Sequence, residues 1–197
     1  MKYFPQLKAI LFLASLIPLS RLAWYGYSDQ LGANPIEFIT RSLGTWTLVF
    51  LLITLSITPL RNLSGWSWLI KLRRMTGLFA FFYALLHFIT YIWLDQFFDL
   101  ASMYKDVIKR PFITIGFAAF VLLIPLALTS TNAMIKRLGG KRWQLLHKLV
   151  YLIAIFAVLH YWWLVKKDIT QPVIYAFILA FLLGYRVWLK RQRVFGL

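Results

Sequence analysis

Six long apolar runs dominate this 197-residue sequence and decide what it can fold into. A helix that crosses a bilayer needs about 20 mainly apolar residues, with a range of about 17–25. Six stretches meet this requirement, at residues 7–27, 42–60, 75–94, 111–135, 143–165 and 169–189. A chain in lipid must satisfy its backbone hydrogen bonds internally, and the runs lack the alternation of barrel strands. The sequence therefore predicts an all-α integral membrane protein, a six-transmembrane-helix bundle that forms a single domain over residues 1–197.

The composition favours a membrane protein over a soluble one. The chain is 61% hydrophobic and only 14% charged, whereas a soluble domain is about half apolar and about a quarter charged. A soluble fold of this size could not bury so much apolar surface, but a bilayer accepts it. The absence of cysteine excludes disulfides, thiolate-held iron–sulfur clusters and covalently attached haem. A cofactor would have to be held by histidine, methionine, carboxylate or backbone groups.

The distribution of charge predicts the orientation of the bundle. The net charge is +16, and the basic residues flank the apolar runs, so topology explains them better than nucleic-acid binding. They concentrate at the N-terminal flank, in the second-to-third and fourth-to-fifth loops, and at the C-terminal end. The opposite side holds every acidic residue of the chain: Asp29, Glu37, Asp95, Asp99, Asp106 and Asp168. The positive-inside rule therefore predicts that both termini are cytoplasmic.

Two of the three histidines lie at matching depth on different spans. At about 1.5 Å per residue, His87 lies roughly 10 Å from the outer end of the third span and His160 roughly 8 Å from the outer end of the fifth. Ionisable groups inside a membrane are costly and are by default functional. Axial ligation of haem iron needs two imidazoles that face each other across a porphyrin within a bundle. We therefore predict that His87 and His160 bind haem iron, with a proton relay or helix–helix hydrogen bonds as alternatives.

The third histidine, His147, lies near the cytoplasmic end of the fifth span. It precedes His160 by 13 residues, which is about 20 Å of helical rise and an angular offset of roughly 220°, so one face would not carry both. It could ligate a second haem, contact a haem propionate or simply lie at the interface. Met75 is a candidate partner at that depth. Arg73 and Arg74 stand where a second histidine would be expected, and they could pair with propionates or a flavin phosphate.

Arg21 is the one charge inside the first span beyond Lys8 of the N-terminal flank, and we expect it to extend toward the membrane surface rather than toward a propionate. The sequence shows no Ser-His-Asp arrangement, no metal-binding carboxylate cluster and no room for a nucleotide-binding domain. We therefore expect no catalytic residues, and whether the chain counts as an enzyme stays open. A haem in the outer half does not reach the cytoplasm, so electrons from inside would need a second haem, a flavin or a quinone.

Five stretches carry a resemblance to a known family. They are LGANPIEFITRSLGTW from Leu31, LLITLSITPLRN from Leu51, LRRMTGLFAFFYALLHFITY from Leu72, KRPFITIGF from Lys109 and ALTSTNAMIKRLGGKRWQLLHKLVYLIAIFAVLHYWW from Ala127. Together they resemble the MsrQ family, formerly YedZ, over nearly the whole chain. The last stretch is the most specific, since it combines the TST-x-A-M turn, the KRW-x-x-LH start and the later HY. This family belongs to the ferric reductase-like transmembrane group.

The resemblance implies a multi-pass cytochrome of the bacterial inner membrane that carries haem b and is associated with FMN. It implies that the chain forms a heterodimer with MsrP, a periplasmic molybdenum-cofactor enzyme that repairs methionine sulfoxide in oxidised proteins. The implied electron source is the quinone pool, with a cytosolic flavin reductase also proposed. By motif position, His87, His147 and His160 correspond to the family's haem-site histidines. The wider group usually places two histidines on each of two helices, whereas this third span has one, which argues against a second bis-histidine haem.

Two other functions remain compatible with the residues. The first is a stand-alone transmembrane metal-ion reductase of the same superfamily, which would use its own outer surface and need no partner. The second is a haem-free membrane anchor or transporter, in which the histidines could be replaced without loss of function.

Overall fold

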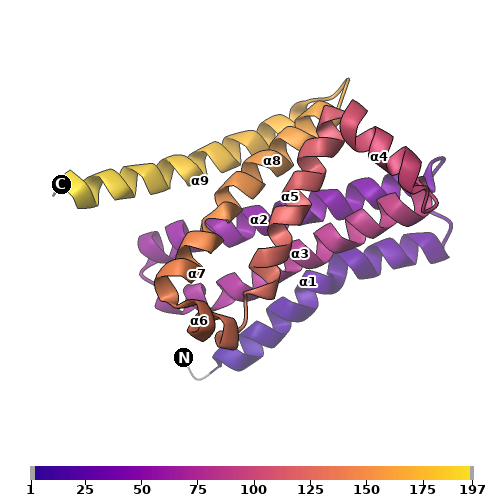
Figure 1. Ribbon diagram of the computed structural model, residues 1–197. Helices are drawn as coiled ribbons and strands as arrows, with labels where there is room; N and C mark the ends of the chain where they lie inside the picture. Colours follow the sequence, from indigo (N-terminus) through magenta and orange to yellow (C-terminus); the bar gives the residue numbers. More distant parts are fainter. Residues whose placement is uncertain (1–2, 196–197) are drawn as a thin grey trace.

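The computed structural model describes the backbone of residues 3–195, and these residues form helices and no strands. The membrane-spanning helices are α1 (Phe4–Tyr27), α2 (Pro35–Ser64), a run made of η1 (Ser67–Leu72), α3 (Arg73–Thr90) and η2 (Tyr91–Asp95), α5 (Pro111–Leu128), a run made of α7 (Gly140–His147) and α8 (Leu149–Leu164), and α9 (Thr170–Phe195). Two shorter helices, α4 (Leu100–Lys109) and α6 (Asn132–Leu138), lie at opposite ends of the bundle (Figure 1). The predicted all-α bundle with six spans is confirmed.

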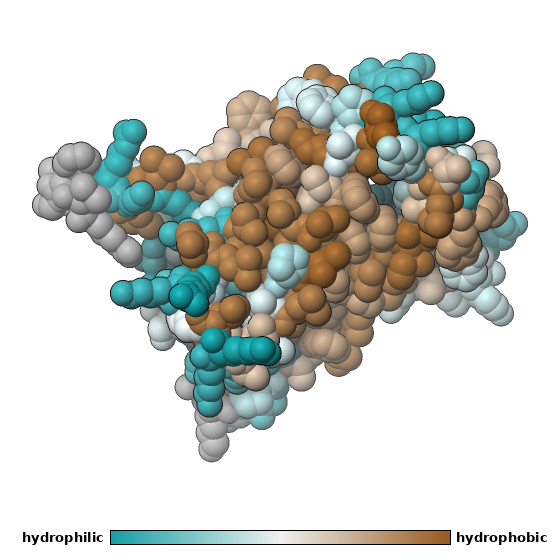
Figure 2. Space-filling model, viewed as in Figure 1, coloured by the Kyte–Doolittle hydropathy of each residue, from teal (hydrophilic) through white to brown (hydrophobic). Residues whose placement is uncertain are grey.

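Helix α2 is the centre of the bundle. Half of its most apolar segment is buried inside the protein, against 17–28% for the other spans. It packs against α1, α3, α8 and α9. The remaining apolar surface faces outward as a broad hydrophobic band between two polar ends (Figure 2). This distribution fits a protein whose outer helices are covered by lipid, because lipid rather than a protein core then accepts the apolar side chains.

Helix α2 is longer at both ends than the predicted span 42–60. It begins at Pro35, where the Asn34 side chain accepts a hydrogen bond from the Glu37 amide, and this polar first turn is invisible to a hydropathy search. The helix also continues past Pro59 to Ser64. Proline has no N–H to bond the carbonyl four residues earlier. Arg186 of α9 donates to that carbonyl, on Leu55, so the helix continues without an unpaired acceptor.

The fourth span is shorter than the predicted 111–135. Helix α5 ends at Leu128 because the hydroxyls of Thr129 and Ser130 donate back to the carbonyls of Pro125 and Leu126. Thr131 then accepts from the Met134 amide and starts α6 as a separate helix. Helix α4 was not predicted as an element. Its short amphipathic sequence falls below the length of a spanning helix.

Aromatic packing joins the first three spans. Tyr83 of α3 is fully buried and its hydroxyl donates to the Ser15 carbonyl of α1 over 2.7 Å. Its ring stacks on Phe50 of α2, with centroids 5.3 Å apart. The buried hydroxyl is therefore satisfied, and these contacts fix α3 against α1 and α2, with His87 toward α8.

Candidate functional site

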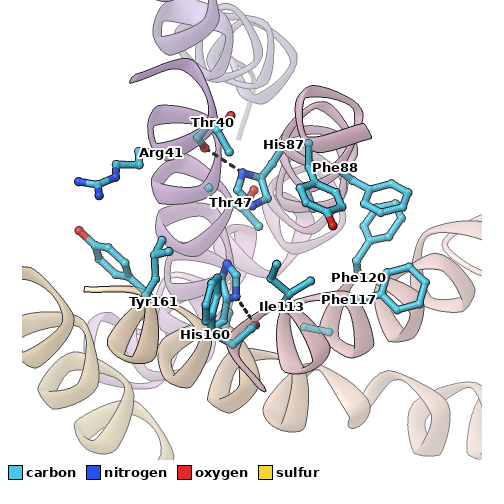
Figure 3. A pocket seen from close by; sticks show the side chains of 18 of the residues that line it. Thr40, Arg41, Thr47, His87, Phe88, Ile113, Phe117, Phe120, His160 and Tyr161 are labelled. Carbon is cyan, nitrogen blue, oxygen red and sulfur yellow. Dashed lines mark hydrogen bonds between the residues drawn. The ribbon is translucent and has the colours of Figure 1, made fainter. Parts of the chain in front are cut away.

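The structure brings His87 and His160 together and leaves His147 apart. His87 of α3 and His160 of α8 point toward each other in the space enclosed by α2, α3, α5 and α8 (Figure 3). Their ring centroids are 6.2 Å apart and the ring planes are inclined by 77°. The depth match deduced from the sequence is thus accompanied by a close approach of the two rings, which lie nearly perpendicular to each other.

Each imidazole of this pair is held by one backbone carbonyl. Nδ1 of His87 lies 2.8 Å from the Thr40 carbonyl of α2, and Nδ1 of His160 lies 2.6 Å from the Phe112 carbonyl of α5. A carbonyl only accepts hydrogen bonds, so each Nδ1 donates a proton. In a neutral ring this leaves the Nε2 lone pair available, which is the arrangement found in metal-ligating histidines.

Two glycines make the close approach possible, and sequence reasoning missed both. Gly44 and Gly116 each lie four residues after the carbonyl that holds a histidine. A Cβ atom at Gly44 would lie 3.0 Å from Cε1 of His87, and one at Gly116 would lie 2.6 Å from Nδ1 of His160. At Gly116 a Cβ would force the His160 ring to move, and at Gly44 it would press on the His87 ring. The available signal was an isolated glycine within an apolar helix, which often marks a close approach.

The pair lines a cavity of about 780 Å³. Phenylalanines 88, 117 and 120 lie on one side of the histidines, and Arg41 and Tyr161 lie on the other (Figure 3). Helix α4 contributes further lining residues at one end. The volume is within the range of about 300–1,000 Å³ that is usual for cofactor and ligand sites. The walls are mainly apolar, so water would be largely excluded from a bound group.

The rim of the cavity next to α4 is polar. Arg41 pairs with Glu37 at 2.5 Å, and Arg110 pairs with Asp106 at 3.2 Å. Tyr91 also lines the cavity, and its buried hydroxyl has no hydrogen-bond partner among the residues described. It belongs to η2, a π-helical turn of a kind that is frequent at functional sites. Periodicity could not have predicted this turn.

His147 has a different environment at the opposite end of the bundle. Its Nε2 lies 3.0 Å from Thr129 Oγ1. That hydroxyl has one proton, which it donates over 2.6 Å to the Pro125 carbonyl, so it accepts from the Nε2–H of His147. The imidazole also stacks on Trp143, with centroids 3.9 Å apart. His147 is not among the residues that line the large cavity.

The donor set fits a flat group that brings most of its own ligands. The described residues contain no cluster of three or more His, Asp or Glu side chains that could hold a bare metal ion. Two imidazoles alone suit an iron whose other positions are already filled by a porphyrin. The ring centroids are 6.2 Å apart, so the two imidazoles are near enough to hold one such group together.

Comparison with known proteins places the chain in a family. The family described as "Ferric reductase like transmembrane component" matches residues 7–158. The chain is 64% identical over 197 residues to the "Protein-methionine-sulfoxide reductase heme-binding subunit MsrQ" of Herminiimonas arsenicoxydans, covering 96% of this chain and 90% of that protein. It is 58% identical over 179 residues to the protein of the same name from Ralstonia nicotianae, covering 90% and 82%. The chain therefore belongs to the MsrQ family of ferric reductase-like transmembrane proteins.

Proposed function

We propose that the chain is a haem b membrane subunit that passes electrons to a periplasmic methionine sulfoxide reductase. The observation that carries this proposal is the facing pair His87 and His160, whose Nε2 atoms are left available over an apolar cavity. The relatives are named as heme-binding subunits of a protein-methionine-sulfoxide reductase, which supports the same role.

In this proposal His87 and His160 are the residues that would hold the haem iron. Haem, when bound, supplies a one-electron redox couple. The carbonyls of Thr40 and Phe112 hold the two rings in orientation and fix the proton on Nδ1. Gly44 and Gly116 provide the space for the rings. Arg41 and Arg110, which line the polar rim, would pair with the carboxylates of the haem.

The direction of transfer follows from charge. The end that carries the histidine pair also carries the acidic residues, and the positive-inside rule makes it the periplasmic side of a bacterial inner membrane, with both termini cytoplasmic. The partner there would be an MsrP-type molybdenum-cofactor enzyme in a heterodimer. It would carry out the sulfoxide chemistry, because the described residues offer no catalytic group for it. The electron source would be membrane quinones or a cytosolic flavin reductase.

A second haem or FMN would have to use the opposite end. His147 is the remaining histidine of the chain, and it already donates its Nε2 proton to Thr129. Ligation of a second iron through Nε2 would require that this hydrogen bond be lost. Contact between His147 and the edge of a cofactor would not require this. No residue of the chain is assigned to FMN.

The test is a dithionite-reduced minus oxidised absorption spectrum of the purified protein in detergent. The wild type should show a b-type spectrum, and His87→Ala and His160→Ala should each lose it. His147→Ala is the matched control, since it removes an imidazole from the same bundle without touching the cavity. A wild-type protein that is folded and shows no haem spectrum would overturn the proposal. Loss of haem in the His147 variant alone would move the site to the other end.

The role in repair needs a second measurement, because a stand-alone metal-ion reductase would pass the spectral test. Cells that lack the gene should accumulate methionine sulfoxide in periplasmic proteins and keep their ferric reductase activity. The reverse pattern, with ferric reduction lost and methionine sulfoxide repair intact, would favour the metal-ion reductase.

A further inference from the structure

Arg21 is the one charged side chain of helix α1 (Phe4–Tyr27) beyond Lys8, which lies near the start of the helix. Helix α1 has 24 residues, so it is about 36 Å long and exceeds a hydrocarbon core of about 30 Å by about 3 Å at each end. Arg21 lies six residues before Tyr27, which places its Cα about 6 Å inside that core. Its guanidinium therefore lies within one side-chain length of the lipid headgroups.

No carboxylate neutralises this guanidinium among the residues described, since the two ion pairs there involve Arg41 and Arg110. Its Nε donates to the Tyr25 hydroxyl over 2.9 Å, and the group lies 5.0 Å from the centre of the Tyr25 ring. Tyr25 is one turn nearer the C-terminal end of α1, and this contact is compatible with the predicted extension of the side chain toward that end. A guanidinium has five N–H donors, and this contact occupies one of them.

The same guanidinium lines a second cavity, of about 370 Å³, between α1 and α2. One wall comes from Ile17, Pro18 and Leu22 of α1. The other wall comes from Phe38, Ser42 and Trp46, in the first turns of α2. The walls are thus mainly apolar, with two hydroxyls from Ser42 and Tyr25, and Arg21 is the one charged residue in the lining. This combination suits a molecule with an anionic group next to hydrocarbon.

We propose that the groove between α1 and α2 binds a phospholipid, with its phosphate on Arg21 and the start of an acyl chain along Ile17 and Trp46. The bilayer supplies phosphate groups at the depth that this guanidinium reaches, and a planar guanidinium matches a phosphate through two parallel hydrogen bonds. The lipid comes from the leaflet at the end where α1 finishes, which is the end that carries His87 and His160. This inference does not depend on the proposed haem.

Native mass spectrometry of the full chain in detergent tests the proposal. The probes are phosphatidylglycerol and a diacylglycerol with the same acyl chains, which lacks the phosphate. Wild-type protein should retain at least about ten-fold more phosphatidylglycerol than diacylglycerol, and Arg21→Gln should abolish this difference. Lys109→Gln is the control, because it removes an exposed cation at the same end of the bundle but outside the groove. Arg21→Lys, which keeps the charge without the planar fork, should retain an intermediate amount.

Three outcomes would overturn the inference. They are equal retention of the two lipids by the wild type, unchanged retention in Arg21→Gln, and displacement of the lipid by excess inorganic phosphate, which would identify free phosphate as the ligand. The comparison of the two lipids uses wild-type protein alone. Equal retention would therefore overturn the inference even where a variant fails to fold.

Discussion

The two ends of the bundle each hold histidine, but with opposite protonation. At one end His87 and His160 use Nδ1–H to bond backbone carbonyls, which leaves Nε2 available. At the other end His147 uses Nε2–H to bond Thr129, and that nitrogen is engaged. The hydrogen bond that each ring makes decides which of its nitrogens is left available to a ligand.

The two ends also differ in the space around the rings. The facing pair lines a cavity of about 780 Å³ and is backed by two glycines. The His147 ring instead stacks on Trp143 at 3.9 Å. The first environment can accept a planar group, whereas the second is already filled by an aromatic side chain. Four predictions test whether this contrast governs function.

Gly116→Ala should have the largest effect, because it attacks the space behind His160. The added Cβ would lie 2.6 Å from Nδ1, so the ring must move and its bond to the Phe112 carbonyl must weaken. Overpacking of this kind costs about 1–3 kcal/mol, which corresponds to roughly a 5- to 150-fold loss of haem affinity. Haem retained through purification, measured by absorbance per protein, reports the change.

Gly77→Ala is the matched control for Gly116→Ala. Its Cβ would meet only Thr54 Cγ2 at 3.7 Å, which is ordinary van der Waals contact, and haem content should not change. Gly44→Ala should fall between the two, since its Cβ would lie 3.0 Å from His87. Full haem content in Gly116→Ala would mean that the close packing of glycine against imidazole is not needed for the site.

The charged residues at the rim of the cavity should shift the midpoint potential of the proposed haem. Arg110 lines the cavity and is paired with Asp106. Arg110→Gln leaves the carboxylate without its partner, and a nearby negative charge opposes addition of an electron, so the midpoint potential should fall by about tens of millivolts. Asp106→Asn should raise it, because the arginine is then unopposed. Potentiometric titration of the haem spectrum measures both variants.

A matched pair at the other end makes this charge test specific. Lys136→Gln and Lys141→Gln remove exposed cations near His147, and neither should move the potential measurably. Equal shifts from both ends would show that the rim has no special relation to the redox group. Shifts of the same sign in Arg110→Gln and Asp106→Asn would contradict the electrostatic cause.

The sequence predicted the parts of this contrast that depend on composition and depth. Hydropathy located six spans, and rise per residue matched the depth of His87 and His160. The sequence could not predict that Gly44 and Gly116 lie against the two imidazoles, because these contacts depend on how helices from distant parts of the chain pack together. The helix boundaries at Pro59 and Thr129 were also missed. They depend on hydrogen bonds by Arg186 and by hydroxyl side chains, which a hydropathy average does not register.

Thr129→Val should have a moderate effect, confined to the His147 end. The substitution keeps the shape but removes the hydroxyl that accepts from His147. The resulting unpaired N–H should lower the free energy of unfolding by about 1 kcal/mol, or about 2–4 °C in thermal unfolding followed by circular dichroism. The haem spectrum should be unchanged. Thr129→Ser keeps the hydroxyl and is the control, and a haem spectrum altered by valine alone would show that the two ends are coupled.

Protonation of Asp99 in acid should have the smallest effect of the four. It should loosen the start of α4, at the end of the bundle that holds the facing histidines. The side chain of Asp99 starts this helix by accepting from the amides of Ala101 and Ser102 and from the Ser102 hydroxyl. The hydroxyl and amide of Ser102 lower the pKa of Asp99 below its ordinary 3.8. The ionised cap is therefore fully present above pH 3.8 and is lost as the pH falls through the depressed pKa.

Hydrogen exchange of the first α4 amides, compared between variants at each pH, can resolve this loosening. Wild-type protection should fall in acid, and the loss should be small because Asp99 is exposed and screened by solvent. In Asp99→Asn the amide oxygen accepts the same bonds without titrating, so the step should disappear while the helix stays capped. An acid step that persists in the asparagine variant would assign the titration to another group. The charged rim pair Arg110 and Asp106, which also contacts α4, would then be the next group to replace.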